Sequence, residues 1–278
     1  MSQKSKTILT KILLYSILII ISFFMILPFV WMLSTSFKLA KDIFGYPPRF
    51  IPENPVLDNY TYVILTKHAL RYLLNTAVIA VLSTIATLFF STLGGYAFAK
   101  YEFPGKKGLF AFLLGTMVIP GAVMMVPAFI IIRQIGWVDT IWPLVIPGAA
   151  SAFWIFFFRQ FISTISNEVM DAARIDGASE FRIYWNIVVP IIAPAITGMG
   201  LIMFMGSWNA YQGPRIYLKS AEKMVMTQAI MSMQGSAGFT AWGEYMALSV
   251  ISLLPLLIIF LVFQRRIVEG VMAGAIKG

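Results

Sequence analysis

The sequence predicts an all-α polytopic membrane protein, on three observations. Hydrophobic residues make up 59% of the 278 residues and charged residues only 12%, with a mean hydropathy of +0.82. A soluble domain carries about 25% charged residues. Six segments approach the roughly 20 apolar residues that a helix needs to cross a bilayer, and they are free of charge away from their ends. We therefore expect six transmembrane helices and no sizeable soluble domain.

The six expected helices are joined by mostly short connections. They lie near Ile12 to Leu33, Tyr72 to Ala99, Leu109 to Ile132, Ile141 to Phe158, Ile187 to Tyr211 and Tyr245 to Phe263. The first follows several lysines, as a secretory signal does. Its apolar run is too long for a signal and contains no small-residue cleavage site, so we expect an uncleaved helix.

Three connections have a distinctive composition. Four prolines between residues 47 and 55 break helix and sheet, which predicts an ordered external loop. KYEFPGKKG, at residues 100–108, carries three lysines and is expected on the cytoplasmic side. A second external segment, after Gly213, contains Met224, Met226, Met231 and Met233. These methionines fit either an adaptable contact surface or a short helix packed on its own subunit.

Several function classes are disfavoured by what the sequence lacks. The expected helices hold no central carboxylate or histidine, which argues against an ion relay of the kind that secondary transporters use. No phosphate-binding GxxxxGK[ST] loop, GxSxG elbow or metal-ligand spacing occurs, and there is no cysteine. The net charge of +9 is spread over the connections, which fits lipid headgroups rather than nucleic acid.

One polar stretch, DAARIDGAS at residues 171–179, interrupts the apolar chain. Ser166 or Asn167 is a plausible N-cap, and Gly177 is suited to end the helix in a left-handed conformation. Ser179 and Glu180 then begin a second helix. The residues predicted to shape the first helix are Glu168 at its positive end, the pair Asp171 and Arg174, and the stripe Val169, Ala172 and Ala173. From physics alone this hairpin is equally a docking element or a solvated connection.

The same stretch resembles the EAA motif of ABC-importer permeases. Asp171-Ala172-Ala173, Gly177, Ile187 and Val189-Pro190 stand at the motif's spacing. Asp171 replaces the usual Glu, Val189 the usual Leu, and Ser166 a common upstream proline. Further stretches resemble the carbohydrate-uptake group, binding-protein-dependent inner-membrane components such as the maltose system's shorter six-helix permease. They are PFVWMLSTSFK at 28–38, LNTAVIAVLST at 74–84, GGYAFAKYEFPGKK at 94–107, SWNAY at 207–211 and QRRIVEGVMAGAIKG at 264–278.

The resemblance implies the type I ABC-importer permease fold and a non-catalytic permease subunit without a cofactor of its own. ATP and Mg would be bound by a partner, a cytoplasmic ABC ATPase dimer. The other implied partners are a second homologous permease subunit, an extracellular solute-binding protein, a carbohydrate substrate and membrane lipid. The implied location is the bacterial cytoplasmic (inner) membrane. The corresponding divisions are a cytoplasmic N-terminus at 1–11, a membrane domain at 12–263 with a coupling loop at about 160–190, and a cytoplasmic tail at 264–278.

Two sets of residues are expected to carry this function by resemblance, and a third set is suggested by its side-chain chemistry, although in the maltose system the sugar is held chiefly by the other permease subunit. Contact with the ATPase is assigned to Glu168, Asp171, Ala172, Ala173, Arg174 and Gly177 in the coupling loop, and to Gln264, Gly274 and Lys277 in the tail. Trp208, Asn209 and Tyr211 have the chemistry of a sugar contact, an aromatic face beside an amide. Aromatic residues near helix ends also form interfacial belts, so both interpretations stay open for these three. An ion-coupled secondary transporter and a non-translocating scaffold remain the alternative functions.

Overall fold

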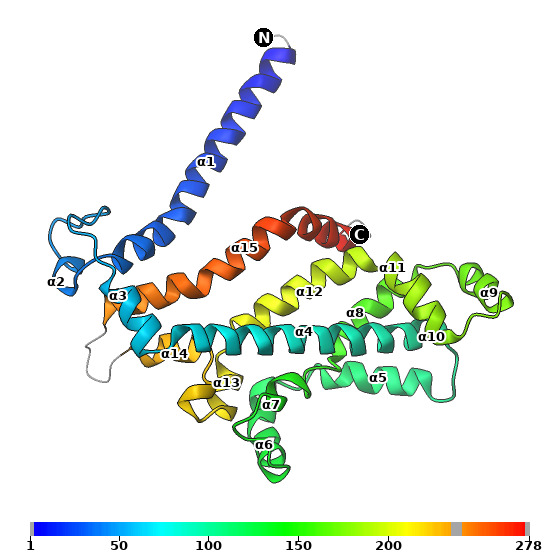
Figure 1. Ribbon diagram of the computed structural model, residues 1–278. Coiled ribbons are helices and arrows are strands. Elements are labelled where there is room, and N and C mark those ends of the chain that lie inside the picture. Colours follow the sequence, from blue (N-terminus) through cyan, green and yellow to red (C-terminus); the bar gives the residue numbers. More distant parts are fainter. Residues whose placement is uncertain (1–2, 235–240, 276–278) are drawn as a thin grey trace. The chain divides into compact units, whose positions relative to one another are not determined.

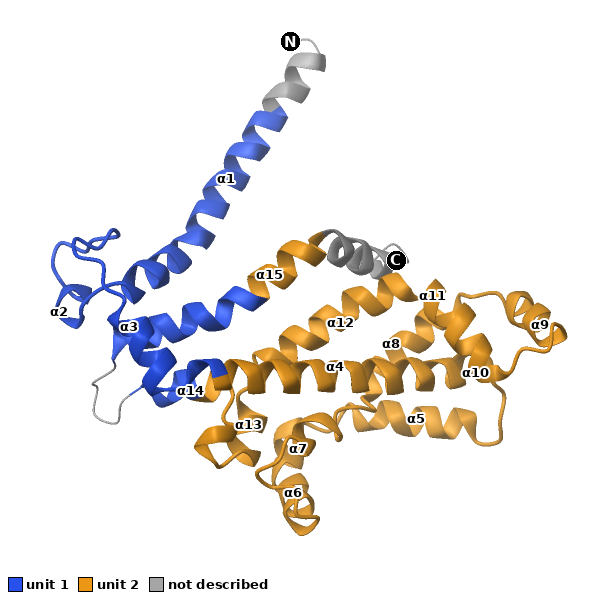
Figure 2. Ribbon diagram, in the orientation of Figure 1, with its two compact units in different colours: residues 1–70, 229–255 blue, residues 71–228, 256–278 orange. Residues whose placement is uncertain are grey.

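The computed structural model describes residues 3–234 and 241–275. The described residues are mostly helical and contain no strand, as the sequence predicts (Figure 1). The chain divides into two compact units (Figure 2). Unit 1 comprises residues 1–70 and 229–255, and unit 2 comprises residues 71–228 and 256–278.

Unit 1 is built around the first and last long helices. Its elements are α1 (Gln3–Ser36), α2 (Ala40–Ile43), α3 (Asp58–Thr61), a π-helical turn (Tyr62–Thr66) and the first part of α15 (Trp242–Ala275). Asn59 terminates α1, because its amide donates to the carbonyls of Ser36 and Lys38, both at 2.9 Å. The lack of a side chain at Gly243 lets α15 approach Asn59 closely, since a Cβ there would lie 2.6 Å from the Asn59 Nδ2 atom.

Unit 2 holds the remaining helices. These are most of α4 (Ala69–Lys100), α5 (Lys106–Thr116), α6 (Gly121–Gln134), α7 (Trp142–Val145), α8 (Ala152–Ser163), α9 (Asn167–Ile175), α10 (Glu180–Ile183), a π-helical stretch (Tyr184–Val188), α11 (Val189–Ile191), α12 (Ala193–Trp208), α13 (Gln212–Tyr217), a 3₁₀ turn (Ala221–Lys223) and the start of α14 (Met226–Ser232). Its core lies where α8, α9, the π-helical stretch and α12 meet α4.

Helix α4 is the common packing partner within unit 2. Gly95 lets α8 approach closely, since a Cβ there would lie 2.9 Å from the backbone nitrogen of Arg159. Hydroxyl groups connect α4 to other helices: Ser83 bonds Ser207 of α12 at 2.8 Å, and Thr92 bonds Tyr184 at 2.7 Å. Small residues and interhelical hydroxyl bonds are the usual means of joining helices in a membrane.

The predicted spans differ in continuity. Three helices are long and apolar enough to cross a membrane: residues 10–36, α4 and residues 242–264. The third and fifth expected spans are bent pairs instead, α5 with α6 at 101° and the helix from Glu180 to Ile191 with α12 at 79°. Pro120 lies at the first break, at the N-cap of α6, and has no N–H with which to continue α5. The fourth expected span is likewise divided, between α7 and the short apolar α8. The described residues therefore contain three to five spans by length and composition.

The expected limits of the membrane domain fall inside helices. Helix α1 begins at Gln3, before residue 12, and α15 continues through residue 264 to Ala275. Within the segment after Gly213, Met226 is fully buried and its N–H donates to Thr76 of α4 at 2.9 Å. For Met226 the structure therefore favours packing on its own subunit over an open contact surface.

Candidate functional site

The polar stretch forms the helix α9 and a sharp turn after it. The Ser166 hydroxyl accepts a hydrogen bond from the N–H of Glu168 at 3.2 Å, which satisfies one free donor at the helix start. At the other end Gly177 has a φ of 81°. The N–H groups of Gly177 and Ala178 donate to the carbonyls of Arg174 and Ala173, both at 3.0 Å, in the pattern of a Schellman motif. The cap and the glycine turn predicted from the sequence are therefore present.

One face of α9 is anchored in the core of unit 2. Met170 is 1% exposed and belongs to the same cluster as Phe158, Ile162 and Tyr184. Ala173 packs against this cluster and lines a cavity of about 310 Å³ between α9 and α10. The sequence predicts Ala173 on one stripe with Val169 and gives no separate role to Met170. The structure instead turns Ala173 inward with Met170, three residues before it.

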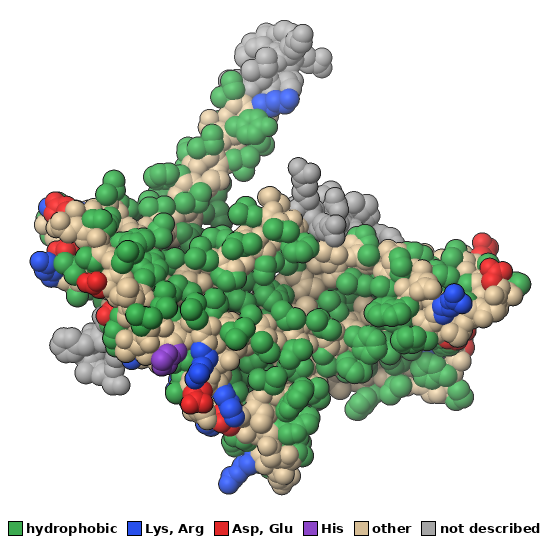
Figure 3. Space-filling view, viewed as in Figure 1, with side chains coloured by type: hydrophobic (Ala, Val, Ile, Leu, Met, Phe, Trp, Pro, Cys, Tyr) green, Lys and Arg blue, Asp and Glu red, His purple; other side chains and the backbone are tan. Residues whose placement is uncertain are grey.

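The rest of the α9 surface is open and partly apolar. Val169 is 46% exposed, Ile175 is 87% exposed, and Ala172 lies between them on the exposed side. These three residues, spaced i, i+3 and i+6, are called the α9 ridge below. Charged side chains of both signs gather around α9 and α10, whereas hydrophobic side chains cover the middle of unit 2 (Figure 3). The three residues together form a small exposed apolar patch on a polar end of unit 2, which makes the α9 ridge a candidate contact surface.

Arg174 joins α9 to α10. Its guanidinium donates to Asp171 at 2.6 Å, and to the two carboxylate oxygens of Glu180 at 2.8 and 3.2 Å. The hydrogen bonds to Glu180, followed by those to Asp171, raise the pKa of Arg174 above its ordinary value. The predicted pair of Asp171 and Arg174 is thus present, but the two-pronged bond to Glu180 is the larger contact.

Glu180 also accepts hydrogen bonds from residues at the end of α4. The hydroxyls of Tyr101 and Tyr96 donate to its Oε2 atom, the latter at 3.3 Å. Burial first, and then the bond to Glu180, raise the pKa of the Tyr101 phenol. Lys100 contacts the other end of α9, because its ammonium donates to the Asn167 side chain at 2.9 Å and to the Ile165 carbonyl. We call Lys100, Tyr101, Arg174 and Glu180 the α4–α9 clamp.

Most of the clamp is not predicted by the sequence. The sequence predicts Glu180 only as a residue at the start of the second helix, and Lys100 only as one of the charges of the connection. The available signal was the order of charges, since Arg174 and Glu180 flank the glycine turn and a turn brings its flanks together. Nothing in the sequence indicated that Lys100 and Tyr101, about 70 residues earlier, meet the same helix.

The three residues proposed for a sugar path do not converge. Trp208 is 2% exposed and its ring lies 5.4 Å from that of Phe204. The Asn209 amide donates to the Met205 carbonyl at 2.9 Å. Only Tyr211 lines an open groove, of about 520 Å³, and its hydroxyl accepts from Arg215 at 2.6 Å.

The predicted tail contacts lie on or beyond α15. Gln264 is exposed, and its amide donates to the Leu261 carbonyl at 3.1 Å. Gly274 lies near the end of the helix, at Ala275. Lys277 lies outside the described residues.

A second polar cluster joins two connections of unit 2. Asp139, in the segment between α6 and α7, has a φ of 61° and accepts the N–H groups of Lys219 and Ser220 at 2.9 and 3.0 Å. The Ser220 hydroxyl donates at 2.5 Å and the Lys223 ammonium at 3.1 Å. These bonds, the two from Ser220 first, hold the pKa of Asp139 well below its ordinary value. Within the part of the chain that the structure describes, no group of three His, Cys, Asp or Glu side chains could hold a metal ion.

Comparison with known proteins assigns the family. Residues 91–272 match the family described as "Binding-protein-dependent transport system inner membrane component". The chain belongs to this family. The matched range of this inner-membrane transport component includes the last part of α4, all of α9 and α10, and most of α15.

Curated relatives extend the match over nearly the whole chain. The trehalose/maltose transport system permease protein MalG of Thermococcus litoralis is 33% identical over 98% of both chains. The lactose transport system permease protein LacG of Rhizobium radiobacter is 31% identical over 97% of both. The arabinooligosaccharides transport system permease protein AraQ of Halalkalibacterium halodurans is 29% identical over 100% of both.

A solved structure shares the fold. A chain of a bacterial ABC transporter involved in the import of the acidic polysaccharide alginate matches with a TM-score of 0.82 and 23% identity, over 95% of this chain and 98% of that chain. The same kind of transporter, in complex with an alginate pentasaccharide-bound periplasmic protein, matches with a TM-score of 0.66 and 17% identity, over 94% of this chain and 97% of that chain. The transport component described here thus has the fold of an ABC-transporter chain.

Proposed function

We propose that this chain is the permease subunit of an ATP-driven, binding-protein-dependent importer, and that it translocates a sugar or oligosaccharide by alternating access. The family match over residues 91–272 carries this proposal. The substrate class is supported by the printed names of the relatives, which transport arabinooligosaccharides, trehalose/maltose and lactose. The chain itself catalyses no reaction in this scheme, and a partner ATPase binds ATP and Mg.

In the proposed mechanism the α9 ridge docks on a cytoplasmic ABC ATPase. Val169, Ala172 and Ile175 supply apolar contact, and the predicted residues Glu168 and Asp171 lie exposed beside them. Gly177 keeps α9 folded back toward α10 through its left-handed turn. Because small side chains let a partner approach the backbone, Ala172 suits the middle of such a contact.

The α4–α9 clamp then passes the movement of α9 into the membrane helices. Arg174 and Glu180 tie α9 to α10, and Lys100 and Tyr101 tie both to the end of α4. Helix α4 packs directly on α8 and bonds α12, so these elements are expected to move as one body when the ATPase closes. The core contacts of Met170 stiffen the same joint.

The proposed topology has six spans with both termini in the cytoplasm. Its first, second and sixth spans are the three long helices, the third and fifth are the two bent pairs, and α7 with α8 supplies the fourth. Lysines 100, 106 and 107 surround the connection between α4 and α5, which supports a cytoplasmic position for this end of α4 and for α9. The bacterial cytoplasmic membrane is the expected location.

The remaining partners in this proposal are a second homologous permease subunit, an extracellular solute-binding protein and membrane lipid. The groove lined by Tyr211 and Arg215 is the part of the candidate sugar path that is open to a ligand. Trp208 is buried and does not line this groove, so it is not expected to contact substrate there. The tail residues Gln264, Gly274 and Lys277 are proposed as a second ATPase contact.

Co-purification from native membranes tests the proposal. The expected result is recovery of an ABC ATPase and a second permease, with ATP hydrolysis stimulated by the binding protein and one member of an oligosaccharide panel. Uptake that persists after deletion of the ATPase would instead favour a secondary transporter. Recovery of the chain without any of these partners would favour a scaffold.

A further inference from the structure

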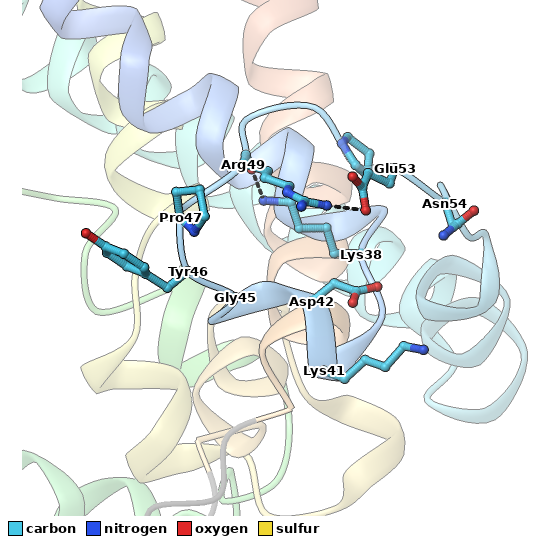
Figure 4. Close-up of a pocket in the computed structure, with 10 residues that line it drawn as sticks. Lys38, Lys41, Asp42, Gly45, Tyr46, Pro47, Arg49, Glu53 and Asn54 are labelled. Atoms are coloured by element: carbon cyan, nitrogen blue, oxygen red, sulfur yellow. Dashed lines mark hydrogen bonds and ion pairs between the residues drawn. The ribbon is translucent and has the colours of Figure 1, made fainter.

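A polar pocket lies within unit 1, in the irregular segment that follows α1. Its volume is about 220 Å³, and all of its lining residues lie between Lys38 and Asn54 (Figure 4). This is smaller than the roughly 300–1,000 Å³ of drug-sized ligand sites. The pocket therefore suits a side chain or a single sugar residue rather than an oligosaccharide. The proposed coupling mechanism does not use it.

Lys38 sets this pocket apart. It is 2% exposed, and it is the only Lys, Arg, Asp or Glu among the described side chains that is buried. Its ammonium donates to the Arg49 carbonyl at 2.6 Å and lies 4.2 Å from the centroid of the Trp31 ring. Burial lowers the pKa of Lys38. Burying a cation without an opposite charge is costly, so an anion that contacts Lys38 would offset this cost.

Residues behind the pocket hold Lys38 in place. The rings of Trp31 and Phe50 meet edge to face with centroids 5.2 Å apart, and the Ser34 hydroxyl donates to the Phe50 carbonyl. The Asn59 amide donates to the Lys38 carbonyl at 2.9 Å. The position of the ammonium is thus set by contacts outside the pocket, which reduces the entropy that Lys38 loses when a ligand binds.

The charges in the pocket leave one cation unmatched. Arg49 and Glu53 pair with each other, which Figure 4 shows as a dashed contact beside the Lys38 ammonium. Lys38, Lys41 and Asp42 remain, two cations to one anion. An ammonium has three N–H donors, and Lys38 uses one on a carbonyl. An acceptor with a negative charge would satisfy both its donors and its charge.

We propose that this pocket binds a carboxylate, held by the Lys38 ammonium. The carboxylate has two potential sources: a uronic acid sugar residue, or an Asp or Glu side chain of the solute-binding protein. The second source rests on the proposed function, because it requires a binding protein on this side of the membrane. The first source does not depend on it.

The test uses the complex purified with the wild-type chain, Lys38→Met or Lys41→Met. Calorimetric titration measures the binding of galacturonate, a uronic acid, with galactose as the uncharged control sugar. Surface plasmon resonance measures the affinity for the solute-binding protein, whose Asp or Glu side chain is the other potential carboxylate. Lys41 lines the same pocket but is exposed, so Lys41→Met is the matched control. Lys38→Met removes a buried charge but also the donor of the Arg49 carbonyl, so the unfolding temperature of each variant is measured to establish that it is folded.

We expect Lys38→Met to weaken one of the two interactions roughly tenfold or more, and Lys41→Met to change it less than about threefold. Loss of galacturonate binding assigns the pocket to an acidic sugar. Loss of binding-protein affinity alone assigns it to a protein carboxylate. Unchanged binding in both titrations, with Lys38→Met folded, overturns the proposal. If galacturonate binding depends on Lys38 but no ATPase co-purifies, the proposed function fails while the pocket assignment stands.

Discussion

Glu180→Gln is the sharpest perturbation of the α4–α9 clamp. The substitution keeps the shape of the side chain and removes its charge. Arg174 then keeps its bond to Asp171 at 2.6 Å, so α9 retains its own structure. What weakens is the connection from α9 to α10 and α4, which runs through the Glu180 carboxylate.

The size of the effect follows from the bonds at Glu180. Its carboxylate accepts two bonds from Arg174 and one each from Tyr101 and Tyr96. Bonds to charged groups contribute about 1.5–3 kcal/mol against 0.5–1.5 for neutral ones. The side chains of Arg174 and Glu180 are 35% and 46% exposed, and solvent reduces the difference toward 1 kcal/mol. Weakening the clamp by about 1 kcal/mol raises the equilibrium ratio of open to closed clamp about fivefold.

The assay compares sugar uptake with ATP hydrolysis in proteoliposomes that contain the complete importer. For Glu180→Gln we expect uptake per ATP to fall about fivefold, with ATP hydrolysis maintained. Glu102→Gln is the matched control, because Glu102 is also an acidic residue near the end of α4 but pairs only with Lys106, at 2.8 Å, and is 90% exposed. It is expected to behave as wild type.

Equal uptake per ATP in Glu180→Gln and wild type would refute the clamp as a transmission element. A parallel loss of uptake and hydrolysis in an assembled importer would also contradict it, because uptake per ATP would then be unchanged.

Three further substitutions test other parts of the structure. Gly177→Leu places a side chain in the left-handed region, which costs about 1–2 kcal/mol although the side chain meets no neighbour. Uptake per ATP should therefore fall, and it should fall less in Gly177→Asn, because Asn tolerates this conformation better. Equal uptake per ATP in the wild type and both variants would contradict a role for the turn. Gly95→Ala should destabilise the chain by about 1–3 kcal/mol in thermal unfolding, because its Cβ meets the α8 backbone, whereas Gly115→Ala should not. Asp139→Asn should lower the unfolding temperature at neutral pH. Because the folded pKa of Asp139 is lowered, the stabilisation is present above the ordinary aspartate value of 3.8 and is lost as the pH falls through the folded pKa. The difference in unfolding temperature between Asp139→Asn and the wild type should therefore become smaller in acid. A difference that does not depend on pH would contradict the stabilising role of the ionised Asp139.

Local features of the site were predictable from the sequence, because they depend on neighbouring residues. The Ser166 cap, the left-handed Gly177 and the pair of Asp171 and Arg174 each follow from residue type and spacing along one helix. The helical class was predictable from the composition, and the positions of the apolar segments from the order of apolar and charged residues along the chain.

Features that depend on tertiary contacts were not predictable. Whether Ala173 or Ile175 faces the core is decided by where the cluster around Met170 lies, and that cluster draws on helices far apart in the chain. The breaks at α5–α6 and α7–α8 interrupt segments that read as continuous by hydropathy. Proline marks them, but proline is also tolerated inside α1 and α15, at Pro28 and Pro255, so it does not decide a break by itself.

The α9 ridge is proposed as the docking surface for the ATPase. The measurement that tests this proposal is retention of the ATPase during purification from native membranes, with Ile175→Asp compared against Ile51→Asp. The two isoleucines are 87% and 83% exposed, so neither substitution disturbs a core. We predict that Ile175→Asp releases the ATPase while Ile51→Asp retains it as wild type does. Full retention of the ATPase by Ile175→Asp would contradict the claim.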